Sequence, residues 1–229
     1  MVLANQHLVE ADFSGRHLTQ FSAEGSRFDR CIFDRAVIDS ASFGAGRIVS
    51  EYVGCRFDGA KLSMGAGGNA RFVDCTFENT RIEHWFCFAV QLVGCTFSGR
   101  LAKAVFNGAV PADKQAIAGR RINEFEGNDF ARAKLVDVSF RTGIDLTRQR
   151  LPIGDEYVYI DDAAAAVRRA RIAYNEWNDP DAKKRARGVL AVMEEDVAAG
   201  QAQLLVRPDD YPRAARPAIR LLLEAARAF

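Results

Sequence analysis

Apolar residues recur every five positions along the first two thirds of the chain. Between residues 11 and 50, an apolar residue stands in the middle of each successive group of five, and mostly polar residues surround it. These middle positions hold Phe13, Leu18, Ala23, Phe28, Phe33, Ile38, Phe43 and Ile48. A period of five fits neither an α-helix nor an alternating strand, which repeat at 3.6 and 2 residues. The pattern therefore indicates a repeat architecture.

Four groups of five make a longer period of twenty residues, seen most clearly at Phe57, Phe77 and Phe97. Each turn then stacks on the one before, about 4.8 Å away, which is the spacing of hydrogen-bonded strands. The middle residue of each group faces the axis, and the residue two positions earlier also faces inward, near a corner where small side chains fit. The predicted core residues are Phe13, Phe28, Phe33, Phe43, Phe57, Leu62, Phe72, Phe77, Ile82, Leu92, Phe97, Phe125, Phe130, Leu135 and Phe140.

Several groups of five share one order: a small residue, a polar residue, Phe or Leu, and two polar residues. Residues 11–15 (ADFSG), 55–59 (CRFDG) and 75–79 (CTFEN) follow it. In this order the sequence resembles the pentapeptide-repeat proteins, and the resemblance covers roughly residues 11–151. It implies a mainly β fold, a right-handed four-sided parallel β-helix, which is followed here by an α-helical C-terminal region. One solenoid fold serves many roles, so the resemblance says little about activity.

The period slips between Ile48 and Phe57, where two groups occupy nine residues instead of ten. We expect a one-residue deletion near residues 51–54, with Tyr52 or Val53 facing inward. A second interruption runs from Leu101 to Ile122, and we expect an insertion loop at about residues 103–122. Pro111 and Gly119 suit the start and the end of a short helix within it.

One side of the central turns departs from the rule. Residues 65–68 are almost without side chains, and one turn later Trp85, Phe86 and Phe88 stand over them. Trp85 occupies a corner position that is normally small, and Gly65 beneath it would leave room. Phe86 and Phe88 occupy positions that normally face solvent, where an aromatic patch usually marks an interface. Either the chain's own C-terminal segment or another protein covers them.

The fivefold period ends at about Pro152, and the pattern after it is mainly helical. We expect a solenoid domain over residues 1–152 and an α-helical module over residues 153–229. Residues 154–162 read as extended, and apolar stripes predict helices ending near Trp177 and Ala199. The last helix starts near Pro217, with Phe229 in its stripe. Three helices are marginal as an independent domain, so we expect them to pack on the solenoid end or to dimerise.

Composition limits the function classes. The 229 residues are 48% hydrophobic with a formal net charge of +1, which is typical of a globular protein and implies no direct binding to nucleic acid. Five cysteines without a secreted-domain spacing favour reduced thiols and a cytoplasmic location. The N-terminus lacks a signal-peptide pattern, and no apolar run reaches transmembrane length, so no membrane association is expected.

The sequence contains few candidate residues for catalysis or metal binding. His7, His17 and His84 lack metal-ligand spacing, and the column Cys55, Cys75 and Cys95 is better explained by packing. No phosphate-loop, serine-hydrolase or zinc-protease motif occurs. The sequence therefore predicts no catalytic residue, no metal site and no cofactor.

These observations predict a non-enzymatic protein-interaction scaffold. The candidate interaction residues are Trp85, Phe86, Phe88, Lys114, Arg120 and Arg121. The resemblance implies a type II topoisomerase, DNA gyrase, as one partner and antibiotic self-resistance as one role. Acidic and basic residues alternate on this rod, which counts against the DNA mimicry of gyrase-protecting members but leaves a loop contact open. The alternatives are a ligand-binding or enzymatic role at the side formed by residues 65–68 and 85–88, an effector or immunity partner, and a homodimer.

Overall fold

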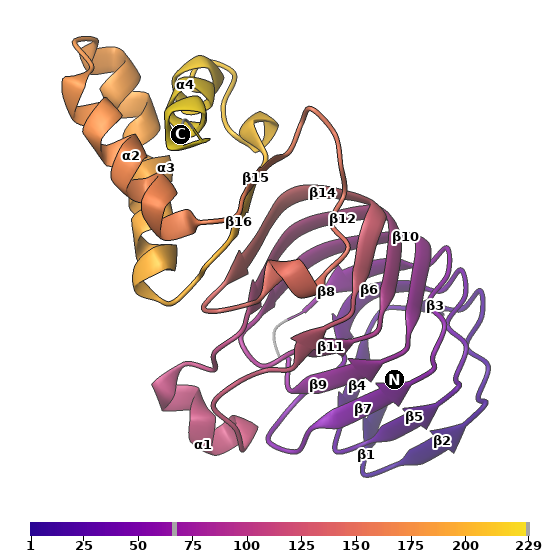
Figure 1. The fold of residues 1–229 in the computed structure, drawn as a ribbon. Helices are drawn as coiled ribbons and strands as arrows, with labels where there is room; N and C mark the ends of the chain where they lie inside the picture. The colour runs from indigo at the N-terminus through magenta and orange to yellow at the C-terminus, as the bar shows by residue number, and fades with distance from the viewer. Residues whose placement is uncertain (66–67, 228–229) are drawn as a thin grey trace. The chain divides into compact units, whose positions relative to one another are not determined.

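The computed structural model describes residues 1–65 and 68–227, without the side chain of Cys87. The chain divides into two compact units (Figure 1). The first comprises residues 1–139 and 147–152, and the second comprises residues 140–146 and 153–229. Residues 140–146, expected within the solenoid, thus belong to the second unit.

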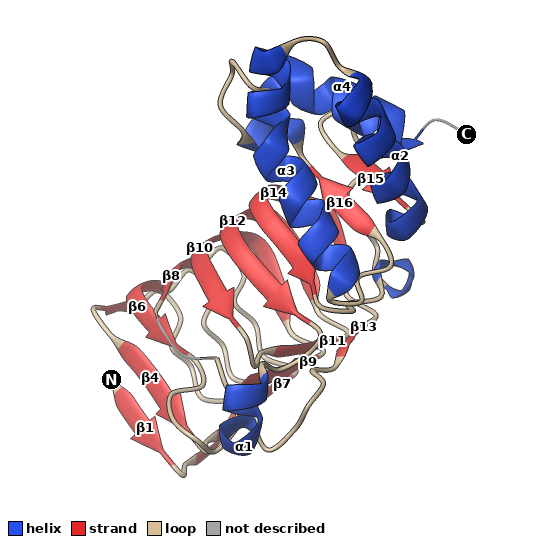
Figure 2. Cartoon of the chain, turned by 90° about the vertical axis from the view of Figure 1, so that its left-hand side faces the viewer, coloured by secondary structure: helices blue, strands red, loops and turns tan. Residues whose placement is uncertain are grey.

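The first unit is a parallel β-solenoid whose strands stack in two long sheets (Figure 2). One sheet contains, in spatial order, β1 (Val2–Ala4), β4 (Phe21–Glu24), β6 (Val37–Ser42), β8 (Lys61–Met64), β10 (Thr76–Cys87), β12 (Thr96–Asn107) and β14 (Asp129–Arg141), with β3 (His17–Leu18) also paired to β6. The other contains β13 (Phe125–Glu126), β11 (Gln91–Val93), β9 (Ala70–Val73), β7 (Ser50–Val53), β5 (Arg27–Asp29) and β2 (His7–Val9).

Each turn meets the next on four sides. The first turn pairs with the second at places five residues apart, and every partner lies twenty residues later. These pairs are Val2 with Ser22, His7 with Arg27, Asp12 with Ile32, and His17 with Val37. The four-sided parallel solenoid that the family resemblance implies is therefore present.

Stacked aromatic rings fill the axis of the solenoid. Phe57 lies between Phe33 and Phe77, with ring centroids 4.8 and 4.7 Å away and nearly parallel planes. Tyr52 stacks in the same way on Phe28 and Phe72, at 4.6 and 4.7 Å. Ring spacing and strand spacing coincide, because each ring is carried by a hydrogen-bonded turn. All fifteen residues expected in the core are buried.

The first irregularity of the period differs from the prediction. Phe28 pairs with Tyr52, twenty-four positions later instead of twenty, so the third turn has gained four residues. Tyr52 is fully buried, but Ile48, predicted to face inward, is 55% exposed in the loop before β7. A gain of four residues and a loss of one look alike when positions are counted in fives.

The insertion begins later than predicted. Strand β12 continues to Asn107, because Phe106 still pairs with Cys87 on the previous turn. The added length lies within residues 108–124, and it postpones the next turn so that Leu92 pairs with Phe125, thirty-three positions later instead of twenty. Within the insertion, a 3-10 turn, η1 (Ala112–Lys114), leads into the short helix α1 (Gln115–Ala118).

Helices dominate the second unit. It contains β15 (Val158–Ile160), α2 (Ala163–Glu176), α3 (Pro180–Ala198), β16 (Leu204–Val206), η3 (Pro208–Asp210) and α4 (Arg216–Arg227). Aspartates cap α2 and α3 at their N-termini: the Asp162 carboxylate accepts from the Ala165 amide, and the Asp179 carboxylate accepts from the Asp181 amide. Phe229 lies outside the described residues.

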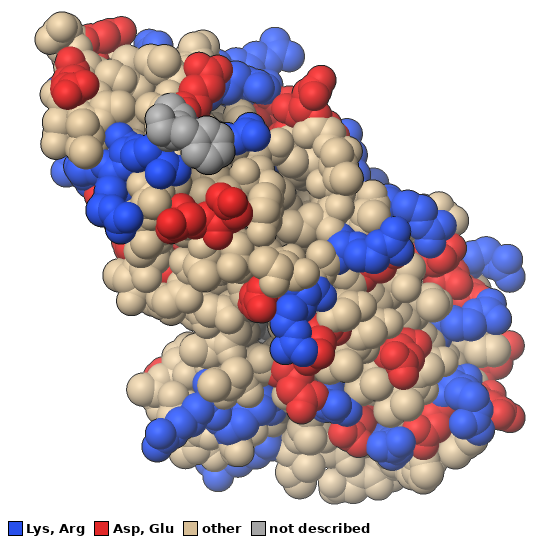
Figure 3. Space-filling view, in the orientation of Figure 1, with Lys and Arg blue, Asp and Glu red and all other residues tan. Residues whose placement is uncertain are grey.

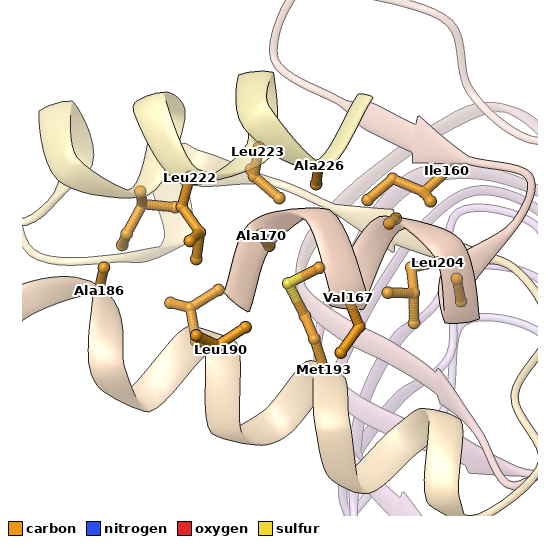
Figure 4. Close-up of a cluster of buried hydrophobic side chains, with 14 of the residues drawn as sticks. Ile160, Val167, Ala170, Ala186, Leu190, Met193, Leu204, Leu222, Leu223 and Ala226 are labelled. Carbon is orange, nitrogen blue, oxygen red and sulfur yellow. The ribbon is translucent and has the colours of Figure 1, made fainter. Parts of the chain in front are cut away.

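The apolar stripes of these helices form one core (Figure 4). Leu190 and Met193 of α3 pack with Val167 of α2 and with Leu222 of α4. The antiparallel pair β15–β16 adds Ile160 and Leu204 to the same cluster.

Gln201 binds residues 140–146 to the rest of the second unit. Its side-chain oxygen accepts from the amides of Gly143 and Ile144, at 3.0 and 3.1 Å, and its side-chain nitrogen donates to Ile144 O at 2.7 Å. Arg141 pairs with the buried Asp196 at 2.5 Å. These contacts explain why 140–146 group with the helices although β14 continues as far as Arg141.

The stacked rings yield a stability prediction. We expect Phe57→Ala to lower the free energy of unfolding by about 3–5 kcal/mol, because it leaves a cavity between two parallel rings. The exposed Ile48→Ala is the control and should change stability by less than about 0.5 kcal/mol. Urea unfolding followed by circular dichroism measures both, and equal losses would contradict the assigned register.

Candidate interaction site

The candidate site is an exposed aromatic corner formed by Phe86 and Phe88 at the end of β10. Phe86 is 54% exposed and Phe88 is 36% exposed. Exposed phenyl rings on a rigid turn lose little side-chain entropy on binding and are common in protein interfaces. Residues 65–68 were expected to lie beneath these rings; of these four, Ala66 and Gly67 lie outside the described residues.

Trp85 is not part of this surface, contrary to the prediction. It is 2% exposed, and its ring lies 5.4 Å from that of Phe106 and 5.8 Å from that of Phe72. In register it stands opposite Ala104, a small residue. The atoms nearest to a side chain built at Gly65 would be those of Ser40 and Ala41. Trp85 therefore fills the core, and its predicted role as an interaction residue is wrong.

The insertion stands beside the corner as a hairpin-like loop. Its two arms pair in antiparallel fashion: Val110 N donates to Arg121 O at 2.8 Å, and Asn123 N donates to Gly108 O at 2.7 Å. Gly119 ends α1 in the left-handed region, with φ of +69°, a conformation that favours glycine. The loop thus has a defined conformation of its own.

A polar network fixes this loop to the solenoid. The side-chain amide of the buried Asn123 donates to Phe88 O at 2.9 Å and to Asn107 O at 2.8 Å. Arg120 donates to Asn123 Oδ1 at 3.0 Å, to Asn69 Oδ1 at 2.9 Å and to the carbonyl of Ala89. The network therefore holds the backbone that carries Phe88.

The same network corrects the predicted role of Arg120. Its guanidinium is directed at Asn69, Asn123 and backbone carbonyls, and burial lowers the pKa of this side chain. Arg120 therefore positions the loop instead of offering its charge to a partner. This role could not be predicted from the sequence, because Asn69 lies fifty-one positions away.

Lys114 and Arg121 remain on the surface of the insertion. Lys114 pairs with Asp113 at 3.0 Å, while Arg121 is exposed. Lys and Arg atoms gather over the insertion, at the lower left of Figure 3. Ile117 and Ile122, 40% and 73% exposed, add apolar surface to the loop. Both isoleucines were missed in the sequence. They could have been noticed as large apolar residues in a segment that lacks the fivefold period and therefore has no predicted core position for them.

The outer faces of the solenoid carry alternating charges. Arg27 pairs with Asp29 at 2.8 Å and with Glu51 at 2.7 Å, and Arg71 pairs with Glu124 at 2.7 Å. Figure 3 shows acidic and basic side chains interspersed over this unit. Exposed pairs contribute little stability, but together they leave no continuous acidic surface in this view.

The stacked cysteines fill space in the core of the solenoid. Cys31, Cys55, Cys75 and Cys95 are buried free thiols, and the Cys55 and Cys75 thiols lie 3.3 Å from carbonyl oxygens of the preceding turn, those of Phe28 and Tyr52. Burial raises the pKa of the Cys75 thiol well above its ordinary value. Among the described residues, no cluster of three or more His, Cys, Asp or Glu side chains could hold a metal ion.

Comparison with protein-family models finds no match to the chain, and a search of curated proteins finds none either. Among the helices that the structure describes, none is long and apolar enough to cross a membrane.

The buried network yields a prediction for the loop. We expect Asn123→Ala to destabilise the protein by about 1–3 kcal/mol, because the carbonyls of Phe88 and Asn107 lose their donor. Amide hydrogen exchange in residues 108–124 should quicken more than elsewhere in the solenoid. Arg121→Ala, at an exposed neighbouring position, is the control and should leave exchange unchanged. Equal exchange in both variants would contradict the anchoring role.

The thiol column yields a second prediction. In the native protein, we expect Cys31, Cys55, Cys75 and Cys95 to resist alkylation by iodoacetamide, because the packed turns deny the reagent access to these buried side chains. All four should react in denaturant, which serves as the positive control. Peptide mass spectrometry assigns each site, and rapid native labelling of Cys75 would contradict the packing interpretation.

Proposed function

We propose that this protein is a non-enzymatic interaction scaffold that presents the aromatic corner and the insertion loop to a protein partner. The observation that carries the proposal is the exposure of Phe86 and Phe88 on a backbone held by Asn123. A parallel β-solenoid is a rigid support of the kind that scaffolds use, and its stacked core leaves function to corners and loops.

The surface favours a partner with an apolar pocket bordered by acidic groups. Phe86 and Phe88 supply the apolar contact, and the exposed Ile117 and Ile122 extend it. Arg121 adds a positive charge beside them. Aromatic residues and arginine at the centre of an interface typically supply most of its binding energy.

The resemblance to pentapeptide-repeat proteins makes a type II topoisomerase the first partner to test. The alternating charges of the outer faces argue against imitation of DNA. The contact would instead use the insertion, beside the aromatic corner. This version of the proposal predicts a change in supercoiling by DNA gyrase, with or without a gyrase poison, at saturating protein.

Paired substitutions test the scaffold proposal. We expect Phe86→Ser with Phe88→Ser to weaken partner capture at least about tenfold while leaving the free energy of unfolding within about 0.5 kcal/mol. Val9→Ser, another exposed apolar position of the same unit, is the control and should retain capture. Quantitative pull-down from the native lysate measures both.

Two results would separate the general proposal from its sharper version. If the double variant captures the same proteins in the same amounts, the aromatic corner is not the interface. If partners are lost from the double variant but gyrase activity is unaffected by the unmodified protein, the scaffold proposal stands and the topoisomerase is excluded.

A further inference from the structure

The N-terminal end of the solenoid presents a complete ring of outward-facing backbone groups. Between the first and second turns, hydrogen bonds run in both directions at distances of 2.7–2.9 Å. The amides of Ser22, Arg27, Ile32 and Val37 donate to the carbonyls of Met1, Gln6, Ala11 and Arg16. The carbonyls of Glu24, Asp29, Ile32 and Asp34 accept from the amides of Asn5, Glu10, Phe13 and Gly15.

The twenty-residue register transfers this pattern to the first turn. Its equivalent groups are the amides of Val2, His7, Asp12 and His17 and the carbonyls of Ala4, Val9, Asp12 and Ser14. They point away from the second turn, and the side chain of Gln6 donates to one of them, Ala4 O, at 3.0 Å. An exposed strand edge is a template for pairing, and here the edge runs around all four sides.

The core layer of the first turn is also incompletely covered. Leu8 and Leu18 are half-buried, although they face the axis. Phe28 and Ile38, the residues at the same positions one turn later, are 0% and 1% exposed. A further four-sided turn against this end would bury the apolar layer as each turn buries the layer of its neighbour.

Titratable side chains at this rim contact the second turn. Each of three reaches back to a titratable side chain there. The pairs are His7 with Asp29 at 2.6 Å, His17 with Asp39 at 2.8 Å, and Glu10 with Arg30 at 3.0 Å. Arg16 lies over the ring of Phe13, 5.3 Å from its centroid. The rim therefore carries both acidic and basic groups, Asp12 and Arg16 among them, so two such ends do not meet as surfaces of a single charge sign.

We propose that two copies of this chain pair through their N-terminal ends, head to head about a twofold axis. A single added strand would satisfy one side of the ring, whereas only another four-sided end matches all four. The ring contains as many donors as acceptors, which a self-complementary contact requires. The contact continues the stacking by which the turns already associate, now with antiparallel strands, and it closes on two copies. It uses a surface other than the aromatic corner, so it goes beyond the proposed function.

Removal of two donors tests the pairing. Val2→Pro with His7→Pro deletes two amides that face away from the second turn, so no hydrogen bond within the solenoid is lost. Val2→Ala with His7→Ala is the matched control, which keeps both amides but loses the same side chains and the exposed pair with Asp29. The proteins begin at Met1, because added residues would occupy the end.

Sedimentation equilibrium from about 1 to 100 µM measures the association. We expect the unmodified protein and the alanine control to form dimers, and the proline variant to dimerise at least about tenfold more weakly. Phe86→Ser with Phe88→Ser should remain dimeric, which separates this result from the test of the proposed function. Circular dichroism and thermal melting verify that each variant is folded.

Hydrogen exchange supplies a second readout that does not depend on a variant. At high concentration, the amides of Asp12 and His17 should exchange more slowly than at low concentration. An unmodified protein that stays monomeric throughout, a dimer that the proline substitutions leave intact, or filaments in place of dimers would each overturn the proposal.

Discussion

The structure depends on the coincidence of two distances. Hydrogen-bonded strands stand just under 5 Å apart, and the aromatic rings of the axis stack at 4.6–4.8 Å. A ring on one turn therefore meets the ring of the next turn at van der Waals distance without straining the backbone. Every other feature of the solenoid follows from keeping this register, including the small or polar character of the remaining positions.

Changes of length are confined to the corners. The extra residues before β7 and the insertion at residues 108–124 both form loops outside the stacked turns. The period resumes after each of them, with Tyr52 and Phe125 buried in the core. An insertion within one of the four straight sides would displace an aromatic ring from its stack. An insertion at a corner can form a loop without moving the rings. The exposed apolar residues of the insertion lie on such added length, which the core does not require.

The sequence predicted the solenoid well, because its period is carried by residues with one physical role. Phe57, Phe77 and Phe97 have the same surroundings, so a count of positions locates them. The same count failed at Ile48, where a gain of four residues imitates a loss of one. It also failed for Trp85, which was expected at the surface because its side chain is large for a corner position. The residue opposite it on the next turn is the small Ala104, which leaves room for the indole ring in the core. The role of Arg120 could not be predicted, because two of its partners, Asn69 and Ala89, come from earlier turns.

Gln201 has a consequence for cooperativity. Strand β14 begins in the first unit and ends at Arg141, yet the residues that follow are hydrogen-bonded by the side chain of Gln201, which lies just after α3. No single cut in the sequence separates the two units, since 140–146 and 147–152 belong to different ones. Loss of the helical core would strip Ile144 of its partners and fray the end of β14. The end of β14 therefore depends on the second unit's helices for its stability, although the strand begins in the first unit.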